Sequence, residues 1–409
     1  MTLYVSFLLH IYQPPTQSPT VLKQIIKESY KPLINLLKLN ESSKMTFNIN
    51  GSLLELLEFY QESELLSNIK ELLRRNQIDL VGSSCYHAIL PLIPKEEMIR
   101  QMELNEQIHR EVLGEELFNP KGFWLPEMAY EYRVIDPLFN ANYKWTVISS
   151  VASPDKELPD NYIPYVNPDF TIFFRNDLLS NLISFKNPTV DEFYTELIGE
   201  NDPEKDDYYV ILAMDGETYG HHVKGLIENF LQPLLMKIKQ DPNIKLIKIN
   251  EISTIFQEKK KISPLPSSWS TSEEDLRKGV PFPLWSDPEN RIHNLQLTVM
   301  NHTLYLVGLA QKYQNNNNDN ENSEDIKRRF KNARAWLDKG LHSCQLWWAS
   351  GKPWYSSEMI LKGLNQLILA SSEALKVILW NSSDGYIKDE SLKIFNEIFE
   401  AQKEIYLSV

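Results

Sequence analysis

Short β-rich runs alternate with longer helical stretches through the first 250 residues, and this alternation limits the possible folds more than any other feature. Helix-like stretches such as Ser52–Ser67 and Pro94–Leu113 separate several of the runs. Such alternation is typical of βα units around a parallel sheet, and seven or eight units fit a closed barrel. The candidate strands are Leu3–His10, Met45–Asn50, Ile78–Ser83, Gly122–Glu127, Lys144–Ser150, Thr171–Asn176, Tyr208–Asp215 and Ile244–Asn250.

An open, doubly wound sheet is the alternative to a barrel. A nucleotide-binding sheet of that kind carries a glycine-rich phosphate loop after its first strand. The residues that follow His10 contain no such loop, which weakens this alternative.

Polar residues lie at or next to the ends of six candidate strands. In a barrel these ends converge on one rim, where active sites are built. A single polar strand end is usually a turn or a helix cap, whereas six on separate units favour a site. The six residues are His10, Asn50, Ser83, Glu127, Arg175 and Asp215.

The pattern changes after Asn250, which predicts a second domain. Residues 1–257 are expected to form the barrel and catalytic domain, and residues 258–290 a linker and irregular segment rich in proline and serine. Residues 291–409 are expected to form a helical bundle that completes the active-site cleft. Its helices are predicted at about 291–313, 325–349, 356–379 and 388–405, with an asparagine-rich loop at Asn315–Asp325.

Composition excludes several classes of protein. The net charge of -13 argues against a nucleic-acid partner, because phosphate binding needs clustered Lys and Arg. Two distant cysteines, Cys85 and Cys344, give no disulfide framework and indicate free thiols in a reducing compartment. The apolar N-terminus lacks the basic start and cleavage site of a signal peptide, and no run is long enough to cross a bilayer. We therefore expect a cytoplasmic protein.

The stretch Trp124-Leu125-Pro126-Glu127 is the sharpest candidate site. Pro126 fixes its own φ and biases Leu125 toward extended geometry, which would hold the Glu127 carboxylate rigidly at a strand end. A glutamate placed there beside Trp124 could attack an anomeric carbon. A glutamate that caps the next helix is the structural alternative.

The stretch Met214–His222 is the second candidate site, because two acids, two glycines and two histidines lie within eight residues after an apolar strand. Like charges repel and glycine loses entropy on folding, so such density is costly in a simple turn. Its acids and histidines could be metal ligands, or Asp215 could be an acid/base carboxylate with a tuned pKa. No histidine pair has the spacing of a metalloprotease helix, which favours acid/base chemistry.

Two carboxylates on different strands are what glycosidic bond cleavage requires, one as nucleophile and one as proton donor. Other residues could bind the hydroxyl groups of a sugar or stack an aromatic ring on it. The nine Trp and nineteen Tyr are more than the core of a chain this size needs, which favours such stacking. A lone histidine is more often structural, and paired tryptophans on a helix more often belong to the core. The further candidates for substrate binding are His10, Gln13, His87, Trp124, Arg175, Glu217, Trp347 and Trp348.

Taken together, these residues resemble glycoside hydrolase family 57, which includes amylases, amylopullulanases, glucanotransferases, branching enzymes and α-galactosidases. The first family motif, His-x-His-Gln-Pro, is matched by His10–Pro14, with Tyr12 in place of the second histidine. The second motif is matched loosely around Asp79, where the family has glutamate, and the fifth weakly at Gln345–Trp348. The third motif, Trp-x-x-Glu, and the fourth, Asp-x-Glu-x-x-Gly-His, are the specific ones. They fall on Glu127 and on Asp215, with Glu217, Gly220 and His221 in place.

The resemblance implies an incomplete (β/α)7 TIM-like barrel followed by a C-terminal helical bundle. Such a barrel has one strand fewer than the eight candidates, so we expect one candidate, Met45–Asn50 or Ile244–Asn250, to be merged with another strand or discarded. It also implies a retaining mechanism on α-linked glucan or oligosaccharide, with Glu127 as nucleophile and Asp215 as acid/base. Asp79 and His221 become further substrate-binding candidates. We expect no cofactor, no metal, and no nucleic-acid or membrane partner.

Three other functions stay open at this point. The same site could transfer glucan, as in glucanotransferases and branching enzymes, because transfer depends on acceptor subsites that no motif reports. A metal-dependent enzyme such as a polysaccharide deacetylase needs a His-x-Asp motif near the first strand. This chain has Gln13 there and no nearby acid, which counts against this function. A catalytically silent carbohydrate-binding protein is disfavoured by the presence of both acids.

Overall fold

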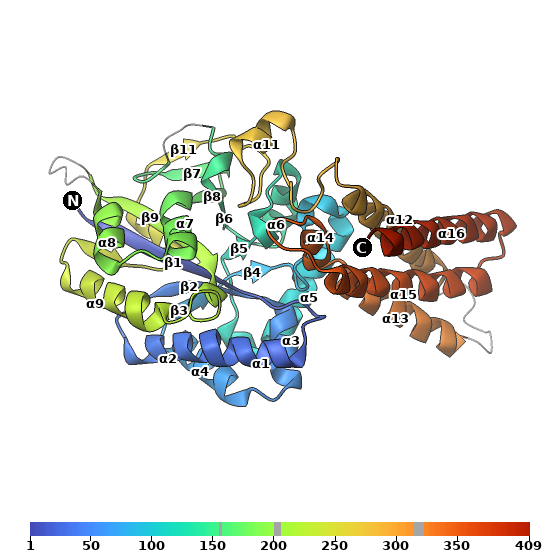
Figure 1. Ribbon diagram of the computed structural model, residues 1–409, viewed down its shortest axis with the longest axis horizontal. Helices are drawn as coiled ribbons and strands as arrows, with labels where there is room; N and C mark the ends of the chain where they lie inside the picture. Colours follow the sequence, from blue (N-terminus) through green and yellow to red (C-terminus); the bar gives the residue numbers. More distant parts are fainter. Residues whose placement is uncertain (155–157, 200–205, 315–322) are drawn as a thin grey trace. The chain divides into compact units, whose positions relative to one another are not determined.

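The computed structural model describes residues 1–154, 158–199, 206–314 and 323–409 (Figure 1). These residues form two compact units, which are considered one at a time below. The predicted asparagine-rich loop lies mostly outside the described residues. The first unit consists of Met1–Cys85 with Leu90–Glu273, and the second of Tyr86–Ile89 with Glu274–Val409.

The first unit is an incomplete seven-stranded (β/α) barrel with parallel strands, which confirms the predicted fold class. The strand order is β9–β1–β2–β3–β4–β5–β6–β8, in which β3 and β4 are one run interrupted at Val81. A bond from the N–H of Asn176 to the carbonyl of Ile211 links the end of β8 to β9. The strands are β1 (Leu3–Ile11), β2 (Met45–Ile49), β3 (Ile78–Leu80), β4 (Gly82–Ser83), β5 (Gly122–Trp124), β6 (Trp145–Ser149), β8 (Phe170–Arg175) and β9 (Tyr208–Asp215).

Three short strands lie at the edges of the sheets, and two of them are absent from the sequence prediction. Strand β7 (Ile163–Asn167) pairs antiparallel with β8, and β11 (Lys259–Lys261) pairs with β7. Strand β10 (Ile244–Leu246) pairs with the start of β1 and is the candidate strand outside the seven. The residues predicted as a linker therefore begin with a strand of the first unit.

The interior of the first unit contains an apolar cluster with members from β1, β5, β6, β7, β8 and β9. Its members include Leu8 on β1, Trp124 on β5, Val147 on β6, Phe173 on β8 and Ile211 on β9, each at most 1 % exposed. Parallel strands are covered on both faces, so they are apolar along their whole length, and their polar residues collect at the ends. This is why the strands could be located from short apolar runs.

Helices connect the strands and cover the outside of the sheets (Figure 1). The expected helix Ser52–Ser67 is two helices, because Gln61 adopts a left-handed φ of 58° between them. The α-helices and π-turns of this unit are α1 (Pro19–Ile25), the π-turn η1 (Ile26–Tyr30), α2 (Lys31–Leu39), α3 (Gly51–Phe59), α4 (Ser63–Arg74), α5 (Lys95–Leu113), α6 (Ile135–Asn140), α7 (Asp177–Asn181), the π-turn η7 (Leu182–Lys186), α8 (Val190–Ile198), the π-turn η9 (Ile227–Leu231), α9 (Gln232–Gln240) and α10 (Ile249–Ile255).

The candidate strand Ile244–Asn250 is wrong in its second half, where helix α10 begins at Ile249. The carboxylate of Glu251 accepts the backbone N–H of Lys248 at 2.8 Å and so satisfies a donor at the helix start. A local cap therefore overrides the strand preference of the isoleucine-rich run.

The second unit is helical. The predicted helix 291–313 is confirmed as α12, and the predicted helix 325–349 is broken after Gly340. At the break, Ser343 donates its backbone N–H to the carbonyl of His87 at 3.0 Å, which takes the chain out of helical geometry. The helices are α11 (Glu273–Lys278, whose first residue belongs to the first unit), α12 (Arg291–Tyr313), α13 (Ser323–Gly340), α14 (Cys344–Ala349), α15 (Ser357–Asn381) and α16 (Gly385–Ser408).

None of the helices in the described ranges combines the length and the apolar character that crossing a membrane requires.

Candidate active site

Glu127 lies just beyond the carboxyl end of β5 in a left-handed backbone conformation. Leu125 is extended, as expected before a proline, and Glu127 then adopts φ 60° and ψ 18°. This region costs a residue with a Cβ about 1–2 kcal/mol and persists only where surrounding contacts impose it. Here the carbonyl of Glu127 accepts the backbone N–H of Trp269 at 3.1 Å. The backbone of the predicted nucleophile is therefore held from outside its own strand.

Trp269 also contacts the Glu127 carboxylate, and the sequence prediction missed it. Its indole Nε1–H donates to Oε2 of Glu127 at 2.9 Å. A donor directed at a carboxylate favours the charged form, which is the form a nucleophile needs. An isolated tryptophan in a Pro/Ser-rich stretch was the only sequence signal, and that stretch was predicted as a linker.

Asp215 is the last residue of β9 and lies in register opposite His10 on β1. Its side chain is partly buried. Burial raises the pKa of Asp215, and the nearby charges of His10 and Arg175 oppose that rise. A carboxyl group with a raised pKa is suited to hold a proton and to release it during a reaction.

His10 links the two predicted catalytic residues. Its Nδ1 bonds Oδ1 of Asn48 at 2.7 Å, and its ring stacks on Trp124 with centroids 4.7 Å apart. Trp269 meets the His10 ring edge-on at 6.1 Å. His10 therefore pairs in register with Asp215 and contacts Trp269, the tryptophan that donates to Glu127, so Glu127 is linked to this imidazole through Trp269. Burial lowers the pKa of His10, while the charge of Asp215 raises it.

Trp124 is fully buried with the imidazole stacked on it, which favours a supporting role over the predicted stacking against sugar.

Glu217 is buried two residues after Asp215. Its Oε1 accepts the hydroxyl of Tyr30 and, at 2.8 Å, the amide Nε2 of Gln13. Burial and the neighbouring Asp215 raise the pKa of Glu217 to about 8. The structure thus brings Gln13 and Glu217 together beside Asp215, and it adds Tyr30, which no motif had indicated.

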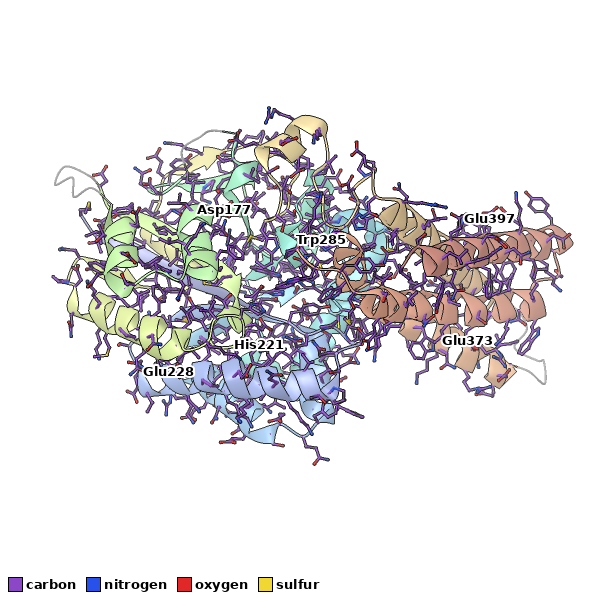
Figure 2. The ribbon with its side chains drawn as sticks, viewed as in Figure 1. Asp177, His221, Glu228, Trp285, Glu373 and Glu397 are labelled. Carbon is purple, nitrogen blue, oxygen red and sulfur yellow. The ribbon has the colours of Figure 1, made fainter. Side chains whose placement is uncertain are left out.

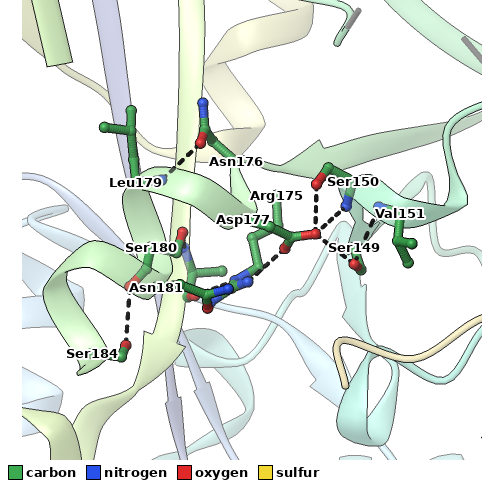
Figure 3. Close-up of polar contacts among 11 residues, drawn as sticks. Ser149, Ser150, Val151, Arg175, Asn176, Asp177, Leu179, Ser180, Asn181 and Ser184 are labelled. Atoms are coloured by element: carbon green, nitrogen blue, oxygen red, sulfur yellow. Dashed lines mark hydrogen bonds and ion pairs between the residues drawn. The ribbon is translucent and has the colours of Figure 1, made fainter. Parts of the chain in front are cut away.

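Arg175 ties the ends of three strands together (Figure 3). The guanidinium donates from Nε to the carbonyl of Ala213 in β9 at 2.6 Å, to Asp177 at 2.5 Å and to Asn181 at 2.8 Å. Asp177 accepts in turn from Ser149 at the end of β6, at 2.6 Å. Arg175 is only 3 % exposed and its donors bind protein atoms, which favours a positioning role over the predicted substrate binding.

The side chains of Asp79 and His221 bond residues outside this strand-end group. Asp79 pairs in register with Thr46, two residues before Asn48 along β2, and its carboxylate accepts from the side chain of Asn250. His221, labelled in Figure 2, bonds through Nδ1 to the carboxylate of Glu28 at 2.7 Å. Both side chains make contacts within the protein, and their binding of substrate stays a prediction.

His87, Trp347 and Trp348 belong to the second unit. The backbone of His87 has a left-handed φ of 60°, and its Nδ1 bonds the hydroxyl of Ser343 at 2.8 Å. The two indole rings lie edge to face with centroids 4.8 Å apart on α14. Their part in substrate binding also stays a prediction.

No group of three or more His, Cys, Asp or Glu side chains capable of holding a metal ion is found within the described ranges. Two cavities of the first unit, of about 350 and 330 Å³, are lined by residues other than those of the strand-end group. The first is bordered by α1 and α2 and the second by the start of β6.

Comparison with known proteins gives one family match. The model of the family described as Glycosyl hydrolase family 57 matches residues 9–264. A 4-alpha-glucanotransferase of Thermococcus litoralis is 27 % identical over 222 residues, which cover 52 % of this chain and 32 % of the relative. An alpha-amylase of Pyrococcus horikoshii is 25 % identical over 285 residues, covering 66 % of this chain and 43 % of the relative. The match thus spans less than half of either relative.

The fold is also similar to that of solved structures. A GH57-type branching enzyme from Pyrococcus horikoshii superposes with a TM-score of 0.70 at 16 % identity, covering 96 % of this chain and 94 % of that one. At this identity the similarity concerns the fold alone.

Proposed function

The chain belongs to glycosyl hydrolase family 57, and we propose that it cleaves α-linked glucan or oligosaccharide with retention of configuration. In this proposal Glu127 is the nucleophile and Asp215 the acid/base. The observation that carries it is that Asp215 lies in register with His10 while Glu127, at another strand end of the same barrel, is linked to His10 through Trp269. The names of the relatives, an amylase and a glucanotransferase, support α-glucan as the substrate class.

The first step forms a glycosyl-enzyme ester. A carboxylate oxygen of Glu127 attacks the anomeric carbon, and the bond from that carbon to the leaving oxygen breaks. Asp215 gives its proton to the leaving oxygen, so the departing sugar leaves as a neutral alcohol. The indole of Trp269 holds Glu127 charged and oriented for the attack.

The second step returns the enzyme to its starting state. Asp215, now ionised, takes a proton from water or from a sugar hydroxyl, whose oxygen attacks the same anomeric carbon. The ester bond to Glu127 breaks and its carboxylate is released. Water gives hydrolysis and a sugar gives transfer, so one site serves both outcomes.

The test is the digestion of maltooligosaccharides by the wild-type chain and by Glu127→Gln and Asp215→Asn. We expect each substitution to lower kcat by at least about 10²–10⁴-fold, because it removes the nucleophile or the general acid. Glu103→Gln, an exposed glutamate on α5, is the matched control and should keep full activity. Near-normal turnover by either site variant would refute the assignment.

Product analysis on the same samples separates the alternatives. Shorter sugars alone indicate hydrolysis, and longer sugars indicate transfer. Proton NMR of the first product reports the configuration at the anomeric carbon, and inversion would contradict the proposed double displacement.

A further inference from the structure

One of the two cavities of the first unit lies beside the helical run α1–η1–α2, whose two helices are labelled in Figure 1. Its volume is about 350 Å³, and it is bordered by this run and by Glu62, the residue before α4. Three of the lining residues are lysines, Lys23 on α1, Lys27 on η1 and Lys31 at the start of α2. Residues four apart share one face of a helix, which is why all three border the same space.

The lysines give this cavity a positive charge in an acidic protein. The chain carries a net charge of -13, whereas the charged residues around the cavity are three lysines and one glutamate. Like charges at this spacing destabilise a helix, so the arrangement brings no gain to the fold itself. A hollow lined by one sign of charge concentrates the field and attracts ions of the opposite sign. The cavity is therefore suited to an anion.

Only part of this positive charge is neutralised by the protein. The Nζ of Lys31 lies 2.9 Å from Oε2 of Glu62, so these two form an ion pair. Lys23 and Lys27 are exposed, and neither forms an ion pair with a residue in the ranges that the structure describes. Two ammonium groups thus remain for a ligand.

The acidic residue of the same turn is engaged elsewhere. Glu28 follows Lys27 on η1, but it does not line the cavity. Its carboxylate binds Lys224 at 2.5 Å and His221 at 2.7 Å, in and next to the loop that follows Asp215. The turn therefore places its lysine at the cavity and commits its glutamate to the active-site loop, which leaves the charge of the cavity uncompensated.

The uncharged lining residues suit a small organic anion. Asn35 supplies an amide that can donate to and accept from hydroxyl groups, and Ile26 and Pro32 supply apolar surface. Pockets for small molecules have volumes of about 300–1,000 Å³ and combine apolar walls with a few polar groups. The volume of about 350 Å³ lies at the lower end of this range, which fits a phosphate group attached to a single sugar.

We propose that this cavity is a binding site for a phosphate group carried by a small molecule such as a sugar, with the phosphate held by the three lysines. Lysine binds phosphate as a point charge, and hydrogen bonds between charged groups are about twice as strong as neutral ones. The ion pair of Lys31 with Glu62 demonstrates that an ammonium group at this cavity can reach an anionic oxygen. The site lies outside the strand-end group, so the inference does not depend on the proposed function.

The test is isothermal titration calorimetry of the whole chain with glucose 6-phosphate, inorganic phosphate and glucose. We expect saturable binding of glucose 6-phosphate that weakens as salt is added, because salt screens the attraction. Equal affinity for inorganic phosphate would show that the lysines suffice, and a lower affinity would show that the sugar contributes; both results support a phosphate site. No saturable binding of either phosphate compound up to about 10 mM, or binding of glucose as tight as that of glucose 6-phosphate, would overturn the proposal.

Substitutions of lysine locate the binding. Lys23→Gln combined with Lys27→Gln should raise the Kd for glucose 6-phosphate at least about tenfold, because it removes two contacts to a charged group. Lys121→Gln combined with Lys239→Gln is the matched control, since both lysines are exposed, lie in the same unit outside the cavity and change the net charge equally. Equal losses of affinity in the two double variants would indicate general attraction to the surface and would overturn the proposal.

Glu62→Gln should have the opposite effect. It removes the carboxylate that occupies Lys31 and repels phosphate, so the affinity for glucose 6-phosphate should rise about two- to fivefold. Damage to the fold would not make binding tighter, and thermal unfolding checks that each variant is folded. An unchanged or lower affinity in folded Glu62→Gln would contradict the assignment of the site.

Discussion

Substitution of Gly220 by alanine should destabilise the first unit and disturb the active-site loop. Gly220 has a φ of 102°, in the region that residues with a Cβ rarely adopt. A Cβ at this position would lie 2.1 Å from the backbone carbonyl oxygen of Glu28 in η1. Because that contact is with backbone, the whole π-turn has to move.

The cost has two parts. The backbone conformation contributes about 1–2 kcal/mol of strain, and the overlap with the carbonyl oxygen contributes about 1–3 kcal/mol, as overpacking does elsewhere. Together they lower the free energy of unfolding by about 2–5 kcal/mol. For a unit of this size, each kcal/mol of lost stability lowers Tm by about 2–4 °C, so Tm should fall by roughly 4–20 °C.

Thermal and urea unfolding of Gly220→Ala measure this loss, with Gly199→Ala as the matched control. Gly199 also has a positive φ, 59°, but no atom lies within 4 Å of its added Cβ, so only the strain applies. If both variants lose the same stability, the contact with Glu28 does not constrain the loop, and the reasoning is refuted. The variant that moves η1 should also lose activity, because Tyr30 moves with it.

Three more outcomes follow from the site. Trp269→Phe removes the N–H donated to Glu127, and kcat should fall about 10–100-fold with little change in Tm; an unchanged kcat would show that the bond is unimportant. Asp177→Asn removes the charged partner of buried Arg175 and should lower the free energy of unfolding by about 2–3 kcal/mol in urea titrations, since Asp177 is itself partly exposed. Glu217 has a folded pKa of about 8, above its ordinary 4.5, so the folded chain holds an extra proton between these values and loses stability as pH rises. Glu217→Gln should abolish this loss of stability with rising pH, which is at most about 1.4 kcal/mol per pH unit. If the unfolding free energies of the variant and the wild type depended on pH in the same way, the raised pKa of Glu217 would be contradicted.

Local sequence signals located the strands and their ends well. The predicted strand Tyr208–Asp215 matches β9 at both ends, because an apolar run bounded by polar residues is what a strand buried on both faces looks like. The same signal placed Glu127 and Asp215 at strand ends. The sequence could not show which polar strand ends belong to the site, because Arg175 and Asp79 each bond a protein partner distant in sequence, Ala213 and Asn250 respectively.

The residues that sequence reasoning missed act through long-range contacts. Trp269 lies 142 residues from Glu127, and Tyr30 lies 187 residues from Glu217, so no local spacing relates them. Strand β11 is three consecutive lysines, which have low strand preference. It forms because the edge of β7 offers free backbone groups, a tertiary effect that outweighs local propensity.

The second unit is assembled from two separate stretches of the chain, and this has a consequence for its biosynthesis. Residues 86–89 leave the ribosome long before their partners, and Ala88 can bridge to His342 only after helix α13 has been made. The residues of the barrel that precede Glu274 can fold early, while residues 86–89 must wait until the chain has been made past α13. A fragment beginning at Glu274 would therefore lack a native strand bridge however well its helices form, and fragments cut at that point are poor substitutes for the whole bundle.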